Sequence, residues 1–509
     1  MILERTKNAK KGIMWGLFAK IVGLLFPFLV RTTIIKTIGI EYVGINGLFT
    51  SLLEILNLTE LGVGTAIVYS MYKPIAEGDK ATICALMNLF KKLYRVIGLV
   101  VLFIGILLLP FTKYLVKGDV PDDVNLYIIY AIYLSNTVIT YWLFAYKNCL
   151  LNAHQRTDII NKVSLVLTAL LYSIQIVVLF VFKNYYTFII LNPLIGIFIN
   201  ITNAYYAGKL FPEYICRGKI SKELQTDIKK RIGGLMLTKI AYKVRYSLGN
   251  VVVSAFLGLQ IIAIYNNYYY IMSAIGGLFS IVTTSITAGI GNSIAIETKE
   301  KNESDMNVLS FIYLSFSLLC FCCLLSLYQP FMYYWVGSEN MFPSMVMILF
   351  SMFFLVDKTL NIVGIYYDAA GLWWKGKYKG LIEATVHIAL TVVLSKYYGV
   401  YGTLIAAILS VLLVGFPLTS YIIYKHYYSK SSLHYIFKHI LIISLFALVG
   451  TIPYFFSKYI VNEYFSDKYL LGSIASLVLN IILCVALYIS IFYRTEIFRR
   501  SVEWVKIHL

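Results

Sequence analysis

The chain has 509 residues, of which 59% are hydrophobic and only 14% charged, and its mean hydropathy is +0.76. Average globular proteins are about 45–50% apolar and about 25% charged, so these values exclude a soluble protein and indicate a polytopic membrane protein. The net charge of +19 would point to nucleic acid in a soluble protein. Its meaning here depends on where the charges lie along the chain.

Fourteen apolar runs, each bounded by charged or turn residues, predict an all-α protein with about fourteen transmembrane helices. In chain order the runs are residues 12–36, 43–71, 84–110, 122–147, 159–182, 186–208, 232–257, 260–296, 306–335, 343–369, 378–396, 399–424, 435–460 and 469–493. The eighth run is too long for one straight span, so we expect it to tilt or to break near Gly276-Gly277. The first run is not expected to be a cleaved signal peptide, because Arg31 interrupts it where a cleavage site would fall.

The basic residues divide unevenly between the two sides of these runs. Of the 44 lysines and arginines, 31 lie in the tails and even-numbered connections, 7 in odd-numbered connections and 6 inside helices. The positive-inside rule then predicts that both termini are cytoplasmic, and the basic excess is mostly a matter of topology. We expect anionic lipid headgroups, and not nucleic acid, beside these charges.

An internal repeat predicts two lobes of parallel topology. The stretch from Lys20 to Gly39 resembles the stretch from Lys239 to Gly258, with a constant offset of 219 residues. Six spans separate the copies, and an even number relates the halves by an axis along the membrane normal. We therefore expect two six-helix lobes around a central cavity, with two further helices appended. The predicted parts are an N-terminal lobe 1–208, a cytoplasmic linker 209–231, a C-terminal lobe 232–428, helices thirteen and fourteen in 429–495, and a tail 496–509.

Six cations lie inside the predicted helices, where a charge costs about 3 kcal/mol and usually faces a cavity or a partner. They are Lys20, Arg31, Lys239, Lys243, Arg245 and Lys358. Lys20 and Arg31 fall on one face of the first helix, and Lys239 and Lys243 share a face of the seventh. These faces predict a cationic cavity between the lobes. The alternatives are that the lysines reach the cytoplasmic surface with their long side chains, and that Arg245 packs within its lobe.

The predicted helices also hold four carboxylates that are candidates for ion coupling. They are Glu54, Glu60, Asp357 and Glu383. A buried carboxylate can exchange a proton or coordinate sodium during transport, or it can form a structural ion pair with one of the cations. Asp357 adjoins Lys358, but neighbours on a helix diverge by about 100°, so the two need not pair. His387 lies one turn beyond Glu383 and can join either arrangement.

Residues for catalysis are not evident in the sequence. It contains no nucleotide-binding Gly-x-x-x-x-Gly-Lys-Ser/Thr loop, no His-Glu-x-x-His and no Gly-x-Ser-x-Gly. We therefore predict that the protein is no enzyme and has no cofactor or bound metal. No external loop carries a cysteine pair, and Cys320, Cys322 and Cys323 are interpreted as packing residues.

The cationic helix faces favour a transporter for a large amphiphile with a phosphate or diphosphate headgroup. Tyrosines in the eighth run are candidates for stacking on sugars if they face the cavity, but residues of this kind more often pack or face lipid. They are Tyr265, Tyr268, Tyr269 and Tyr270.

Two segments resemble the bacterial polysaccharide-export flippases, the O-antigen (Wzx-type) transporters. The first is Gly39-Ile-Glu-Tyr-Val-Gly-Ile-Asn-Gly-Leu-Phe with Leu58-Thr-Glu-Leu-Gly-Val-Gly-Thr-Ala-Ile, and the second is Ala370-Gly-Leu-Trp-Trp-Lys-Gly-Lys-Tyr-Lys-Gly-Leu-Ile-Glu-Ala with Lys396-Tyr-Tyr-Gly-Val-Tyr-Gly-Thr-Leu-Ile. The resemblance implies the multidrug/oligosaccharidyl-lipid/polysaccharide exporter superfamily.

For this chain, the resemblance implies transfer of an undecaprenyl-diphosphate-linked oligosaccharide to the outer leaflet by alternating access, without ATP hydrolysis. Polysaccharide polymerase and chain-length proteins are then expected partners. In the related lipid II flippases, basic residues of the first helix and the second lobe line the cavity. The matching positions here are Lys20, Arg31, Lys239 and Lys243, with Asn250 opposite Arg31. The alternatives are a drug or cation exporter, which should have an acidic cavity, and a membrane-embedded polymerase or ligase, which should have a long external loop.

Overall fold

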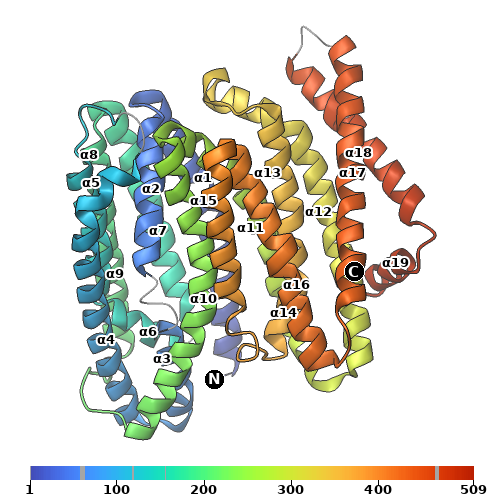
Figure 1. Cartoon of the computed structure of the whole chain (residues 1–509). Helices are drawn as coiled ribbons and strands as arrows, with labels where there is room; N and C mark the ends of the chain where they lie inside the picture. The colour runs from blue at the N-terminus through green and yellow to red at the C-terminus, as the bar shows by residue number, and fades with distance from the viewer. Residues whose placement is uncertain (1, 58–62, 117–119, 155, 465–468, 509) are drawn as a thin grey trace. The chain divides into compact units, whose positions relative to one another are not determined.

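The computed structural model describes the backbone at residues 2–57, 63–116, 120–154, 156–464 and 469–508. Over these residues the chain is helical, with no strand, which confirms the predicted all-α fold (Figure 1). Long apolar runs dictate this outcome, because a helix satisfies every backbone N–H and C=O within the segment.

Several of the helices are long and apolar enough to cross a membrane. Within the described residues eight helices meet this condition, or nine if the bent pair Leu126–Trp142 and Ala145–Ala153 forms one span. Many apolar side chains of these helices are exposed, including Phe103, Phe180 and Val181. An exposed apolar surface of this extent requires lipid around it. The chain is a multi-pass membrane protein.

The chain divides into two compact units, residues Met1–Ala263 and Ile264–Leu509. The first unit contains α1 (Ile2–Thr37), α2 (Glu41–Leu56), α3 (Val63–Glu77), α4 (Lys80–Leu108), α5 (Leu126–Trp142), α6 (Asn148–Ala153), α7 (Thr157–Phe182), α8 (Tyr185–Ile189), α9 (Leu191–Leu210) and α10 (Lys222–Leu257). In this unit α1 packs along α7, α5 packs on α4 and α9, and α10 packs on α2. Its centre is filled by Ile45, Phe49 and Tyr130, which are fully buried.

The second unit is built around α12. The helices in this part of the chain are α11 (Leu259–Ile296), which begins in the first unit, α12 (Lys299–Val336), α13 (Ser344–Asp357), α14 (Thr359–Ala369), α15 (Lys379–Ser410), α16 (Phe416–Ile423), α17 (Leu433–Tyr464), α18 (Tyr469–Phe492) and α19 (Glu496–His508). Helix α12 contacts α13, α14, α17, α18 and α19. Its Phe321 is fully buried, as are Phe350 of α13 and Phe446 of α17.

Each of the fourteen predicted runs overlaps a helix of the structure, but the breaks differ from expectation. Helix α11 is a single helix from Leu259 to Ile296, so of the two alternatives expected for this run, a tilt or a break near Gly276-Gly277, the break does not occur. Glycine costs about 1 kcal/mol in a helix interior, which neighbouring helices offset. A sharp kink occurs instead at Gly399, with φ of 57° and ψ of −134° inside α15, at the first residue of the predicted twelfth run.

The glycines that anchor the predicted repeat have the same structural role in both copies. Gly39 follows α1 with a φ of +124°, and Gly258 follows α10 with a φ of +95°. Residues with a side chain rarely adopt these values, so each glycine ends one helix and redirects the chain into the next. The predicted lobe boundaries remain a prediction. The boundary between the two compact units falls between residues 263 and 264 of the sequence.

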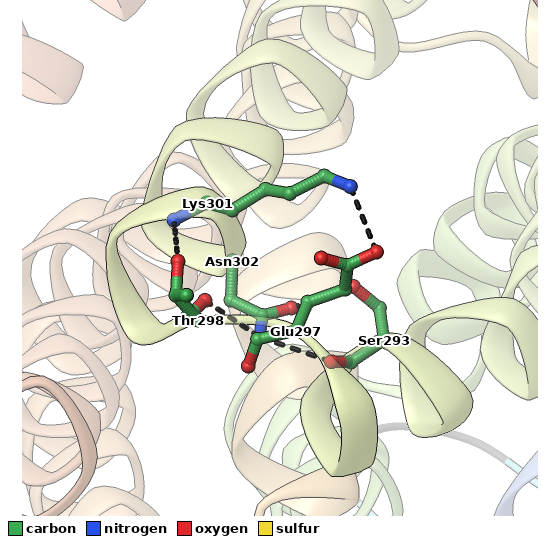
Figure 2. Close-up of polar contacts among 5 residues, drawn as sticks. All are labelled: Ser293, Glu297, Thr298, Lys301 and Asn302. Carbon is green, nitrogen blue, oxygen red and sulfur yellow. Dashed lines mark hydrogen bonds and ion pairs between the residues drawn. The ribbon is translucent and has the colours of Figure 1, made fainter.

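A polar cluster closes the turn between α11 and α12 (Figure 2). The side-chain amide of Asn302 donates to the backbone oxygens of Ser293 and Thr298, both at 3.1 Å, and Ser293 Oγ donates to Asn302 Oδ1 at 2.8 Å. Thr298 caps α12 by accepting from the Lys301 N–H, and Lys301 Nζ lies 2.8 Å from Glu297 Oε1. Asn302 is fully buried, so these bonds satisfy groups that cannot reach water.

Candidate transport site

The predicted cationic faces lie on α1 and α10. Arg31, in the second half of α1, is half-buried. The side chains of Lys20, Lys239, Lys243 and Arg245 fall outside the described residues, although their backbone belongs to α1 and α10. Glu60 lies wholly outside the described residues. The cationic cavity therefore stays a prediction.

Helices α2 and α10 meet through polar side chains. Ser247 Oγ of α10 donates to Glu54 Oε2 of α2 at 2.9 Å, and Asn250 Nδ2 donates to Ser51 Oγ at 3.0 Å. Ser247 and Ser51 are buried, so both bonds lie inside the helix interface. Glu54, a candidate for ion coupling, is thus engaged with α10. Asn250, expected opposite Arg31, bonds to α2.

Helix α2 also approaches the start of α11 closely, at Gly44. A Cβ added there would lie 2.3 Å from the carbonyl oxygen of Leu259, at the start of α11. Only glycine permits this approach. The predicted topology places Gly44 and Leu259 at the outer ends of the second and eighth helices, because connections one and seven are odd-numbered.

Asp357 and Lys358 form an ion pair in the second unit. Lys358 Nζ lies 2.9 Å from Asp357 Oδ2, and the side chains are only 11% and 18% exposed. The two neighbours pair because α13 ends at Asp357 and α14 begins at Thr359, which removes the helical divergence between them. Lys358 Nζ also lies 5.0 Å from the Phe354 ring centre, in cation–π geometry. Its charge is therefore balanced within the unit.

Helix α15 and the segment after it form a hairpin with a polar seam. Ser395 Oγ and Thr403 Oγ1 are 2.8 Å apart, His387 Nδ1 and Ser410 Oγ are 3.1 Å apart, and Lys379 Nζ donates to Thr419 Oγ1 at 2.9 Å. The residue numbers of each pair add to nearly the same value, as they do when two arms run antiparallel. The serines and threonines of the seam are buried between two arms that are otherwise mostly apolar.

Glu383 lies within this seam. It is buried, and a Cβ added at Gly415 would lie 2.5 Å from its Oε1, so the carboxylate of Glu383 packs directly against the backbone of the second arm. Residues 411–415 form a π-helical turn at this level. His387 lies one turn along α15 on the same face. Because the Ser410 hydroxyl donates to Ala407 O, His387 Nδ1 is assigned as the donor to Ser410.

The described tyrosines of α11 pack inside the second unit. Tyr268 is fully buried, its hydroxyl donates to Gln329 Oε1 at 2.9 Å, and its ring lies against Phe350. Tyr265 is also buried and contacts Phe350. Of the interpretations that the sequence allowed for these tyrosines, packing within the protein describes Tyr265 and Tyr268. Tyr269 and Tyr270 are half-buried.

Three of the polar partners were not singled out from the sequence, namely Ser51, Ser247 and Ser410. Isolated serines in apolar helices carry little signal, because serine is common at helix contacts in membranes. The seam did have a signal, since Glu383, His387, Thr391 and Ser395 recur every four residues and mark one helix face. A related omission is the buried pair Cys322 of α12 and Cys484 of α18, whose sulfur atoms are 3.0 Å apart.

Comparison with known proteins rests on the fold. No protein-family model and no curated protein matches the chain. Among solved structures, the lipid II flippase MurJ in an inward closed conformation aligns with a TM-score of 0.65 and 14% identity, covering 95% of this chain and 98% of that one. An inward-facing multidrug resistance MATE transporter of the MOP superfamily aligns with a TM-score of 0.61 and 14% identity, covering 80% and 97%.

The fold is that of the MOP superfamily transporters. This superfamily is the one that the sequence resemblance implied. A third neighbour is a MOP superfamily transporter from Pyrococcus furiosus, described as having a binding pocket of reverse polarity, with a TM-score of 0.53 and 14% identity over 82% of this chain and 95% of that one. At such identities the likeness concerns architecture, so substrate and partners must be argued from this chain's own residues.

Proposed function

We propose that the protein is a flippase that moves an undecaprenyl-diphosphate-linked oligosaccharide from the cytoplasmic to the outer leaflet by alternating access. The observation that carries this proposal is the excess of cations over carboxylates, six against four, in the helices that the sequence predicts to span the membrane. Such a charge is costly in lipid and is retained where it meets an anion or water. A diphosphate is the anion that this amphiphile would carry.

The carboxylates of the spans support an anionic substrate over a drug or cation. Glu54 accepts a hydrogen bond from Ser247, and Asp357 neutralises Lys358. Glu383 is buried in the α15 hairpin. Glu54 is thus bonded to α10 and Asp357 is paired with Lys358, whereas five of the six cations lie on the two helices that the repeat relates, α1 and α10.

Within this proposal the cations have the role of binding the diphosphate. Lys20, Arg31, Lys239 and Lys243 would hold its oxygens by charge-assisted hydrogen bonds. Arg245 is proposed to contribute less to binding of the diphosphate. Lys358 is proposed to contribute through its ion pair with Asp357. We further propose that Glu383 and His387 couple transport to an ion gradient, with Glu54, Glu60 and Asp357 as further candidates. Both termini would face the cytoplasm of a bacterial cell.

The proposal is tested by neutralising Arg31 and Lys243 in cells that depend on the protein for surface glycan. We expect Arg31→Gln and Lys243→Gln each to reduce surface glycan at least tenfold, because each loses about 1.5–3 kcal/mol of charged hydrogen bonding to the diphosphate. Protein level and membrane insertion should be unchanged, as measured by immunoblotting of the membrane fraction.

Lys80→Gln is the matched control, since Lys80 is an exposed residue at the first position of α4. It removes one positive charge of similar size and should leave surface glycan at the wild-type level. Normal glycan in both the Arg31 and the Lys243 variant would contradict the cationic site. A loss in the Lys80 variant as well would show an effect of total charge.

A further inference from the structure

The connection between α14 and α15 presents aromatic and basic side chains on the surface. We name residues 370–378 the aromatic–lysine loop. In it Trp373, Trp374 and Tyr378 are 52%, 70% and 61% exposed. Lys375 is exposed beside them, and Lys377 Nζ lies 4.5 Å from the Trp374 ring centre and 4.9 Å from that of Tyr378. Large rings exposed to water at this density need a partner.

The loop is held in one shape. Trp373 Nε1 donates to Asp368 Oδ1 at 2.9 Å, and Leu372 is buried beneath the loop. Gly371 has a φ of +65°, and a Cβ at Gly376 would lie 2.2 Å from the Tyr367 hydroxyl, so both positions require glycine. The exposure of the rings is therefore built into the fold.

The position of the loop identifies the surface that it meets. It joins two candidate membrane spans, Ser344–Ala369 and Lys379–Tyr428, with only nine residues between them. A connection this short cannot leave the membrane surface. Tryptophan and tyrosine concentrate at the headgroup level, where the ring meets apolar lipid and its polar atom meets water. Trp373 presents an exposed ring in this way, while its indole nitrogen donates to Asp368.

The charge of the loop identifies the lipid. Lys375 and Lys377 lie in the loop and Lys379 follows it, while the nearest acid, Asp368, is engaged by Trp373. Connection ten is even-numbered, so the predicted topology places the loop on the cytoplasmic side. The cytoplasmic leaflet carries anionic phospholipids that attract such lysines.

We propose that the aromatic–lysine loop is a binding site for anionic glycerophospholipid of the cytoplasmic leaflet. Trp373, Trp374 and Tyr378 lie among the headgroups, and Lys375 and Lys377 bind the lipid phosphate. Lys379 is bonded to Thr419 and supports the loop from below. This site is independent of the transported substrate.

The test reconstitutes the full-length protein in phosphatidylcholine bilayers with increasing amounts of brominated lipid, which quenches tryptophan emission on contact. Subtracting the signal of the Trp373→Phe/Trp374→Phe variant isolates the two loop tryptophans from the other four of the chain's six. We expect brominated phosphatidylglycerol to quench the difference signal at lower mole fraction than brominated phosphatidylcholine, by a factor of about five for each lysine engaged.

Two charge variants decide the role of the lysines. Lys375→Gln/Lys377→Gln should abolish the preference for phosphatidylglycerol, and Lys375→Arg/Lys377→Arg should restore it. The matched control, Lys219→Gln/Lys222→Gln, removes two exposed charges from the linker and the start of α10 and should keep the preference. Equal quenching by both lipids in the wild type, a preference retained in the glutamine variant, or no quenching of the loop tryptophans would each overturn the proposal.

Discussion

At the residue scale, His154 links the stability of the first unit to pH. Its ring stacks on Phe211 with centroids 4.2 Å apart, in the turn between α6 and α7. Burial lowers the pKa of His154 below its usual 6.5, and Glu213 opposes this shift. The neutral ring is therefore favoured in the folded protein. Its contribution to stability is full above the unfolded pKa and is lost as pH falls below about 6.5.

We accordingly expect the thermal unfolding temperature of the purified protein to fall between pH 7 and pH 5.5. His154→Gln, which stays neutral throughout, should show a smaller fall over the same interval in differential scanning fluorimetry. Parallel curves for the variant and the wild type would refute the assignment.

The Asp357–Lys358 pair allows a second prediction at this scale. Removing one charge leaves the other poorly solvated, so Asp357→Asn and Lys358→Met should each destabilise the fold by about 3 kcal/mol. The double variant leaves neither charge and should recover a large part of that loss. Thermal unfolding of the four proteins measures the coupling. Additive losses would mean that the two side chains act independently.

At the element scale, the α15 hairpin depends on close backbone approach at Gly402. A Cβ there would lie 2.0 Å from the carbonyl oxygen of Leu394, a clash with backbone that a side-chain movement cannot relieve. We expect Gly402→Ala to reduce the yield of folded protein severalfold. Gly364→Ala in α14, where an added Cβ meets no atom within 4 Å, is the matched control and should be neutral or stabilising by up to about 1 kcal/mol. Equal yields of the two variants, measured by fluorescence size-exclusion chromatography, would contradict this account.

Most helices could be predicted from the sequence because each apolar run must become a helix in lipid. The positions of the kinks could not be predicted from the sequence, because they depend on contacts with neighbouring helices. Gly276-Gly277 resembles a helix break in the sequence, yet α11 is continuous, whereas Gly399 bends α15 where the arms fold together. In the candidate site, the acids were found because a charge stands out in an apolar run. Ser247, the partner of Glu54, and Ser410, the partner of His387, were not found, because a serine does not stand out in such a run.

At the scale of the whole molecule, topology follows from the distribution of charge. We expect an impermeant maleimide to label Ser338→Cys, in connection nine, from outside intact cells, and to label Ser431→Cys, in connection twelve, only after permeabilisation. Both serines are exposed. The background would lack the seven native cysteines. The reverse labelling pattern would invert the orientation and move the aromatic–lysine loop to the outer leaflet.

The fold of a MOP transporter could be predicted from span number, the repeat and the resemblance. The cationic cavity could only be proposed, since the side chains of Lys20, Lys239 and Lys243 lie outside the described residues and periodicity alone does not place them. Arg31 of α1 belongs to the same group of proposed cavity cations, and its side chain is among the described residues.

The most direct measurement of the central claim is lipid movement in proteoliposomes. A fluorescent polyprenyl-diphosphate oligosaccharide would be placed in both leaflets, and its exposure to an external glycosidase followed with and without a proton or sodium gradient. The account predicts that the wild type and Lys80→Gln expose the inner pool at similar rates and that Arg31→Gln/Lys243→Gln does so at least tenfold more slowly. No movement by the wild type under any gradient, or equal rates for the Arg31/Lys243 variant, would contradict it.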